Sequence, residues 1–177
     1  MLEALAEQVL NGLMMGSVYV LVALGLVLVY GVMHVLNFAH GVLFMLGGYV
    51  AHFFFTRVTG SYLLATLLAM LVLAAIGIAL ERGIFRPLAG NLRNQVIASL
   101  GLILVIENLA IAIWGPNALQ LKLWTTETLV SVGTLRFPVH QLLIVAVTAA
   151  MVIALGLFLK RSRFGTAIRA TAQSREA

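Results

Sequence analysis

The chain has no cysteine and very little charge. Without cysteine among its 177 residues, disulfide bonds, thiolate metal sites and thiol chemistry are excluded. Charged residues make up 10% of the chain and hydrophobic residues 62%, whereas soluble globular domains carry about 25% and about 45–50%, respectively. So few charges cannot cover the surface of a soluble domain. The sequence therefore predicts an integral membrane protein.

The formal net charge of +5 raises the question of a nucleic-acid partner. The positions of the basic residues argue against one. They cluster between the hydrophobic runs and near the C-terminus, as they do in the cytoplasmic loops of membrane proteins. No nucleic acid is expected among the partners.

Five apolar runs have the composition of membrane-spanning helices. A helix needs about 20 apolar residues to cross a bilayer core of about 30 Å, and these runs are apolar all round rather than on one face. The predicted fold class is an all-α, polytopic membrane helix bundle, in which one helix is a candidate for a discontinuous span. Residues 1–159 are predicted to form the transmembrane domain and residues 160–177 a cytoplasmic basic segment. The expected spans are residues 9–30, 41–55, 62–80, 96–114 and 139–159.

The first run is expected to be retained as a span and not cleaved as a signal peptide. The leader before it carries Glu3 and Glu7 and no basic residue, and no small-residue cleavage site closes the run. Alternating five spans then places three basic residues on one side of the membrane and eight on the other. The side with more Lys and Arg is cytoplasmic by the positive-inside rule, so the N-terminus is predicted outside and the C-terminus inside. The eight are Arg82, Arg86, Arg93, Lys160, Arg161, Arg163, Arg169 and Arg175.

Three polar residues interrupt the apolar stretch VMHVLNFAHGVLFMLGGYV, residues 32–50. His34 and His40 are six residues apart, which puts them about 240° apart on a continuous helix, so one metal between them is not favoured. With no carboxylate nearby, acid–base catalysis has no partner. Two interpretations stay open: Asn37 caps a helix end at the interface beside a flexible Gly41, or a broken helix exposes backbone groups to a translocation path.

Glu107 lies inside the fourth run, beside Asn108. An ionisable group at membrane depth is costly and marks a functional site by default, facing the bundle interior or a water-filled cavity. The alternative is a protonated or hydrogen-bonded carboxyl group between helices. In both cases Glu107 is predicted to face protein and not lipid.

Four stretches together resemble the LivH-type permeases of branched-chain amino acid ABC importers. They are LNGLMMGSVYVLVALGLVLVYGVMHVLNFAHGVLFMLGGYVA, ERGIFRPL, ASLGLILVIENLAIAIWGP and KRSRFGTAIRATAQSREA, in the family's order. The resemblance implies a permease domain in residues 1–159, with Asn37, His40, Gly41, Glu107 and Asn108 beside the translocation path. In the family the residue at Glu107 is commonly glutamine. The resemblance also implies that this chain is a truncated permease, about its first three-fifths.

The partners implied by the resemblance are a homologous second permease subunit, two ATP-binding subunits and an extracytoplasmic substrate-binding protein. No Walker A pattern occurs in the chain, so ATP hydrolysis would come from those subunits. The resemblance further implies that the chain is not an enzyme and holds no cofactor or metal. It places the chain in the bacterial inner membrane. Residues 160–177 would begin the helix that docks on the ATP-binding subunit, with coupling residues Arg163, Gly165, Arg169, Glu176 and Ala177.

Two other hypotheses remain. A self-sufficient channel or secondary transporter would use Glu107 or His40 as its ion site. A membrane enzyme would use His34 and His40, but no acid, nucleophile or metal-ligand set accompanies them. The exact substrate, whether Leu, Ile or Val or an amide or urea, does not follow from the residues.

Overall fold

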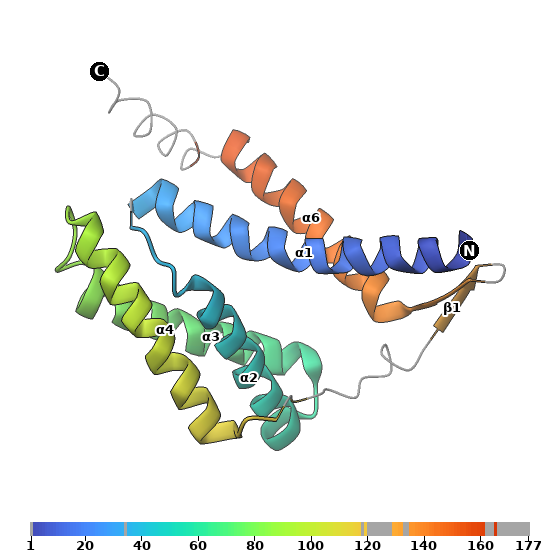
Figure 1. Cartoon of the computed structure of the whole chain (residues 1–177), viewed down its shortest axis with the longest axis horizontal. Helices are drawn as coiled ribbons and strands as arrows, with labels where there is room; N and C mark the ends of the chain where they lie inside the picture. The colour runs from blue at the N-terminus through green and yellow to red at the C-terminus, as the bar shows by residue number, and fades with distance from the viewer. Residues whose placement is uncertain are drawn as a thin grey trace. The chain divides into compact units, whose positions relative to one another are not determined.

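The computed structural model describes residues 2–33, 35–117, 119, 129–132, 135–161 and 165 (Figure 1). It divides into two compact units. One comprises residues 33–121, and the other residues 1–32 and 122–177. The helices of the described residues are α1 (Leu2–Met33), α2 (His40–Phe54), α3 (Tyr62–Leu80), α4 (Leu92–Trp114) and α6 (Val139–Arg161). Two π-helical turns, η1 (Phe55–Thr59) and η2 (Glu81–Phe85), extend α2 and α3.

Five helices of the described residues are long and apolar enough to cross a membrane. With η1, the second span covers His40–Thr59, 20 residues in place of the 15 expected for residues 41–55. The π-helical turn continues the helix through Thr56 and Thr59, whose hydroxyl groups donate to the carbonyl oxygens of His52 at 2.8 Å and Phe54 at 3.2 Å. The predicted all-α membrane bundle with about five spans is confirmed, and the chain is a multi-pass membrane protein.

The helix ends follow from local sequence. Gly60 ends η1 with a φ of 61° and Gly115 ends α4 with a φ of 84°, a region that other residues enter only with strain. Asn91 caps α4, because its side chain accepts from the backbone N–H of Asn94 at 3.2 Å. Pro87 follows η2 by two residues, as expected of a residue that cannot continue a helix.

In the unit of residues 33–121, α2 packs against both α3 and α4. Small residues line these contacts: Ala65 and Ala69 of α3 and Ala110 of α4 are buried, which lets the helix backbones approach closely. The rings of Tyr49 in α2 and Trp114 in α4 lie 5.2 Å apart. Since short turns join the three helices, α2 and α4 run in one direction and α3 in the opposite one.

The other unit contains α1, α6 and a short hairpin of β1 (Leu129–Val132) and β2 (Leu135–Pro138). The strands pair antiparallel, with Val132 opposite Leu135. This hairpin lies between the fourth and fifth expected spans, where no strand was predicted from the sequence. Gln141 of α6 donates through Nε2 to Oδ1 of Asn11 in α1 at 2.8 Å, which links the two helices.

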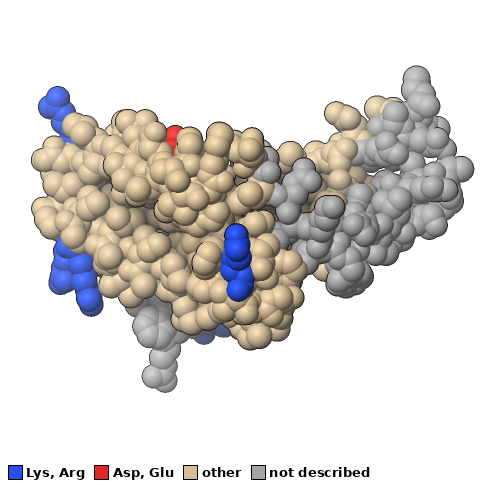
Figure 2. All heavy atoms as spheres, turned by 90° about the horizontal axis from the view of Figure 1, so that it is seen from below, with Lys and Arg blue, Asp and Glu red and all other residues tan. Residues whose placement is uncertain are grey.

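Among the described residues on the face drawn in Figure 2, charge is sparse: Lys or Arg form isolated patches and Asp or Glu a small one. Large apolar side chains are exposed along all five spans. A surface of this kind suits the hydrocarbon of a bilayer and not water.

Candidate functional site at the start of the second span

The connection between α1 and α2 is folded into the protein. Val35 and Asn37 are buried, and Ala39 has no exposed surface. The side-chain Oδ1 of Asn37 accepts from the backbone N–H of Ala39 at 3.0 Å, and the backbone carbonyl of Asn37 accepts from the N–H of His40 at 3.2 Å. This is an Asx turn, in which a short amide side chain mimics a backbone turn. The Asn37 side chain therefore stabilises the turn that leads into α2.

The predicted helix cap at Asn37 needs a correction. The N-cap residue of α2 is Ala39, and it makes no side-chain capping bond. Asn37 acts two residues earlier and satisfies the N–H of the cap residue rather than that of the second or third helical residue. Gly41 lies in the first turn of α2, where a Cβ atom would meet nothing within 4 Å. No close approach therefore requires glycine at this position.

Gln95 in the first turn of α4 is the most deeply buried polar side chain near this connection, with 1% of its surface exposed. Its Oε1 accepts from the backbone N–H of Leu36 at 3.2 Å, and its Nε2 donates to the carbonyl of Leu88 at 3.1 Å. We call this pair of hydrogen bonds the Gln95 bridge. It fixes the α1–α2 connection and the turn before α4 at the same end of the unit.

The buried face of α4 continues from Gln95 along the helix. Ser99 is completely buried, and its hydroxyl donates to the carbonyl of Val96 at 2.8 Å. Ile106 and Ala110 complete the face. Neither Gln95 nor Ser99 was singled out from the sequence. The sequence does carry a signal for them: two polar residues four positions apart at the beginning of an apolar span. That spacing places both on one face of the helix.

Glu107 and Asn108 lie elsewhere on α4. Both side chains are exposed, and the Asn108 Nδ2 donates to the carbonyl of Leu104 at 2.7 Å. Twelve residues separate Gln95 from Glu107, which is about 18 Å along the helix axis. The structure therefore does not gather the predicted path residues at one point: Asn37, His40 and Gly41 lie at one end of the unit, and Glu107 and Asn108 farther along α4.

The predicted coupling residues lie at the end of the chain. Gly165 is described, as a buried helical residue. Arg163, Arg169, Glu176 and Ala177 lie outside the described residues, as does His34. Within the described part of the chain, no three His, Asp or Glu side chains come together in a way that could hold a metal ion.

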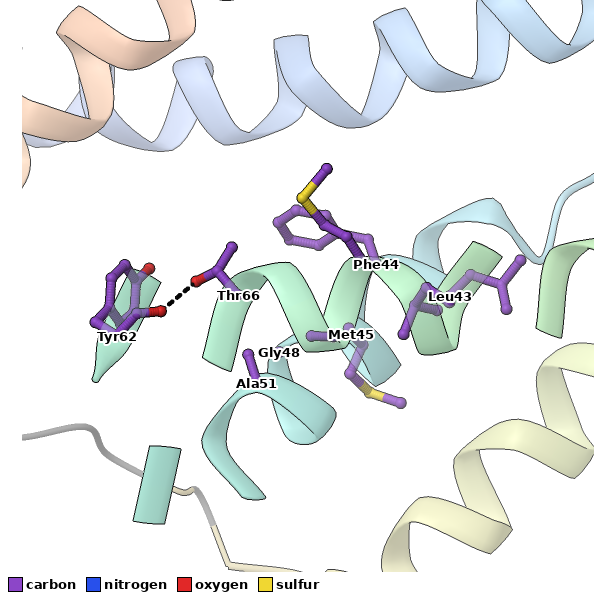
Figure 3. A pocket seen from close by; sticks show the side chains of 11 residues that line it. Leu43, Phe44, Met45, Gly48, Ala51, Tyr62 and Thr66 are labelled. Carbon is purple, nitrogen blue, oxygen red and sulfur yellow. Dashed lines mark hydrogen bonds between the residues drawn. The ribbon is translucent and has the colours of Figure 1, made fainter. Parts of the chain in front are cut away.

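An open groove of about 460 Å³ lies between α2 and α3 (Figure 3). Its walls include Leu43, Phe44 and Met70, and no Asp, Glu, Lys, Arg or His lines it. Thr66 uses its hydroxyl proton within α3, donating to the carbonyl of Tyr62 at 2.9 Å (Figure 3). The groove offers apolar contact but no charged partner for the ammonium and carboxylate groups of an amino acid. It is therefore not a candidate substrate site.

Nearly the whole chain has relatives among known proteins. Residues 8–177 match the protein family described as branched-chain amino acid transport system / permease component. The permease protein BraD of the high-affinity branched-chain amino acid transport system of Pseudomonas aeruginosa is 32% identical over 94% of this chain and 59% of its own length. The corresponding LivH proteins are 30% identical in Escherichia coli K12 and 29% in Salmonella typhimurium, over 94% of this chain and 58% of each relative.

The chain thus spans about three-fifths of the length of the curated relatives it matches. No solved structure is significantly similar to it. The matched relatives are permease components of multi-component transport systems, which argues against the self-sufficient channel or secondary transporter and against the membrane enzyme. The family resemblance predicted from the four sequence stretches is confirmed: the chain belongs to the family of permease components of branched-chain amino acid transport systems.

Proposed function

We propose that this chain serves as the membrane-spanning permease of an ABC importer for branched-chain amino acids or related small amino acids and amides. The observation that carries the proposal is the family match over residues 8–177, together with five apolar helices of spanning length. ATP is hydrolysed by separate subunits, since the sequence holds no Walker A pattern.

The proposed partners are a homologous second permease, two ATP-binding subunits and an extracytoplasmic substrate-binding protein. Support comes from the names of the relatives, each of which is one permease protein of a transport system. The chain by itself lacks an ATP-binding motif, so a system that uses ATP needs the other components.

We place the chain in the inner membrane with its N-terminus outside and its C-terminus in the cytoplasm. The Gln95 bridge joins the α1–α2 connection to the turn before α4, so both lie on one side of the membrane. Arg82, Arg86 and Arg93 surround that turn, and a concentration of arginine marks the cytoplasmic side. These three arginines are among the eight basic residues whose count predicts this orientation.

The translocation path is proposed to pass two polar levels. The Asx turn of Asn37, followed by His40 and Gly41, forms the level at the cytoplasmic end. Glu107 and Asn108 form the second level, deeper in the membrane, where an ionisable side chain is costly unless it serves a path or a protein contact.

Coupling to ATP hydrolysis is assigned to the segment after α6. Its basic residues and the helix-prone stretch TAIRATAQSREA suit a cytoplasmic helix that transmits closure of the ATP-binding subunits to the spans. The residues proposed to carry this contact are Arg163, Gly165, Arg169, Glu176 and Ala177.

Copurification tests this function. Tagged chain in detergent should retain the ATP-binding subunits of its own transport system, and Glu176→Lys should abolish that retention by reversing a contact charge. Glu127→Lys makes the same charge change between α4 and α6, on the side of the membrane proposed to lie outside, and should leave retention unchanged. Equal retention by wild type and Glu176→Lys would show that the coupling segment is assigned wrongly. No retention by wild type would contradict the permease function itself.

A further inference from the structure

Gln95 reaches the α1–α2 connection from a helix far along the chain. The hydrogen bonds of Asn37 within this connection are local: its Oδ1 accepts from Ala39 at 3.0 Å, and its backbone carbonyl accepts from His40 at 3.2 Å. They shape the turn but do not attach it to another helix. The Leu36 N–H makes that attachment by donating to Gln95 Oε1 at 3.2 Å, across 59 residues of sequence.

The other end of the Gln95 bridge is anchored in a tightly folded turn. The Gln95 Nε2 donates to the Leu88 carbonyl at 3.1 Å, and the same carbonyl accepts from the backbone N–H of Asn91 at 3.1 Å. The Leu88 N–H in turn donates to the carbonyl of Phe85, whose side chain is buried. Gly90 adopts a φ of 87° within this turn, as glycine does readily. The turn therefore gives the bridge a firm support.

Glutamine suits this place by its length and by carrying a donor and an acceptor on one group. Only 1% of the Gln95 surface is exposed, so its amide relies on these two partners within the protein. Both partners are backbone groups, which stay in place whatever residue occupies position 95. The Gln95 side chain is therefore the part of the bridge that a substitution can remove.

Gln95 also lies on the helix that carries the second polar level. Helix α4 runs without a break from Leu92 to Trp114, and Glu107 and Asn108 follow Gln95 by about three turns, or about 18 Å. A continuous helix keeps that spacing constant. The Gln95 bridge thus connects the first polar level, in the α1–α2 connection, to the helix that holds the second.

We propose that Gln95 is a positioning residue of the translocation path, and that its two hydrogen bonds keep the first polar level in place relative to the second. This inference rests on the proposed function, which puts both levels beside the path. Gln95 is buried and acts through the α1–α2 connection, without touching the substrate itself. Without the bridge, that connection keeps its Asx turn but shifts against α4. ATP hydrolysis then continues while less substrate passes from one level to the other.

Thiol labelling tests whether Gln95 holds the connection, and the chain has no cysteine of its own. Val35→Cys places a thiol at a position that is 7% exposed, so N-ethylmaleimide should react with it slowly in membranes that contain the assembled system. Adding Gln95→Met should raise this rate about tenfold, because two lost hydrogen bonds raise the population with a displaced connection by about that factor. An unchanged rate would overturn the proposal.

Phe38→Cys is the matched control for labelling. Phe38 lies in the same connection but is 53% exposed. Its thiol should react at the same rate with and without Gln95→Met, because its access to the reagent does not require the connection to move. Equal increases at Val35→Cys and Phe38→Cys would show general loosening of the chain and would overturn the proposal.

Coupled transport tests the consequence for the path. The ratio of leucine taken up to ATP hydrolysed, measured in proteoliposomes with the complete system, should fall several-fold in Gln95→Met. Gln95→Asn, one methylene shorter and unable to reach both partners, should behave in the same way. Asn91→Ala is the control, because it removes the cap of α4 at the same turn but leaves both hydrogen bonds of the bridge; its ratio should equal that of the wild type.

The outcomes separate this inference from the proposed function. Labelling needs no transport, so an unchanged rate at Val35→Cys overturns the inference even in a system that transports. Faster labelling with an unchanged uptake ratio would show that the bridge holds only the fold, and an equal fall in Asn91→Ala would show that lost stability is the cause; either result overturns the role in the path. Absence of ATP-dependent uptake by the wild type would contradict the proposed function itself.

Discussion

Replacing Gln95 by methionine tests how the start of the second span is held. Methionine has nearly the same length and volume, so no cavity forms. The substitution removes both hydrogen bonds of the Gln95 bridge, to the Leu36 N–H at 3.2 Å and the Leu88 carbonyl at 3.1 Å. The remaining effect is the free-energy cost of leaving the Leu36 N–H and the Leu88 carbonyl without Gln95 as a partner.

The Leu88 carbonyl and the Leu36 N–H differ in how many hydrogen-bond partners they keep after the substitution. The Leu88 carbonyl keeps the backbone N–H of Asn91 as a donor at 3.1 Å, so its loss is close to that of one ordinary hydrogen bond, about 0.5 kcal/mol. The Leu36 N–H has no second acceptor among the described residues and becomes an orphaned donor in a half-buried place, at about 1–2 kcal/mol. The gain from burying an apolar side chain at a site that is 1% exposed offsets part of this. We expect a net loss of about 1.5 kcal/mol in the free energy of unfolding.

Thermal denaturation in detergent, followed by the loss of the monodisperse peak on size-exclusion chromatography, measures this loss. For a chain of this length, about 1.5 kcal/mol corresponds to a fall in Tm of about 3–6 °C. Asn94→Met is the control, because Asn94 is the neighbouring residue and its side chain is exposed; its Tm should match the wild type. A Gln95→Met protein that melts with the wild type would refute the claim that the bridge holds this end of the unit.

Three further substitutions give separate expected outcomes. Asn37→Ala removes the side-chain acceptor of the buried Ala39 N–H and should lower stability by about 1–2 kcal/mol, seen as a lower Tm; an unchanged Tm would contradict the Asx turn. Asn91→Ala removes the cap of α4 and should cost about 1 kcal/mol, whereas Asn91→Ser should cost nearly nothing in the same melting assay. Gly115→Ala forces a side chain into a φ of 84° and should cost about 1–2 kcal/mol; equal stability would show that α4 does not end in that conformation.

The membrane spans could be predicted from the sequence because long apolar runs have few alternatives in a bilayer. The third run, residues 62–80, coincides with α3, and the fourth was predicted to end at Trp114, where α4 does end. Gly115 and Pro87 lie where α4 and η2 end, and each acts through its own backbone. Local chemistry of this kind is readable without the fold.

Features that depend on tertiary contacts were missed. Gln95 looked like the polar residue before an apolar run, and its role depends on Leu36, 59 residues earlier in the chain. Asn37 was recognised as a residue that organises a helix start, but its bond to Ala39 rather than a capping bond depends on where α2 begins. The hairpin before α6 and the π-helical extension of α2 carried no strong periodicity, so neither was expected.

The separation of the predicted path residues is the main lesson for the candidate site. Sequence reasoning grouped Asn37, His40 and Glu107 because each is polar in an apolar context. The fold places the first two where α2 begins and Glu107 about 18 Å along α4 from Gln95. Polarity at membrane depth identifies candidates, but only the arrangement of helices decides which of them can act together.

Transport by the reconstituted system tests the proposed permease function most directly. The chain would be incorporated into proteoliposomes with its ATP-binding subunits and second permease, and labelled leucine supplied with the binding protein. We expect uptake that requires ATP and does not respond to a proton or sodium gradient. Uptake that follows an ion gradient and proceeds without ATP or the ATP-binding subunits would contradict the proposed function.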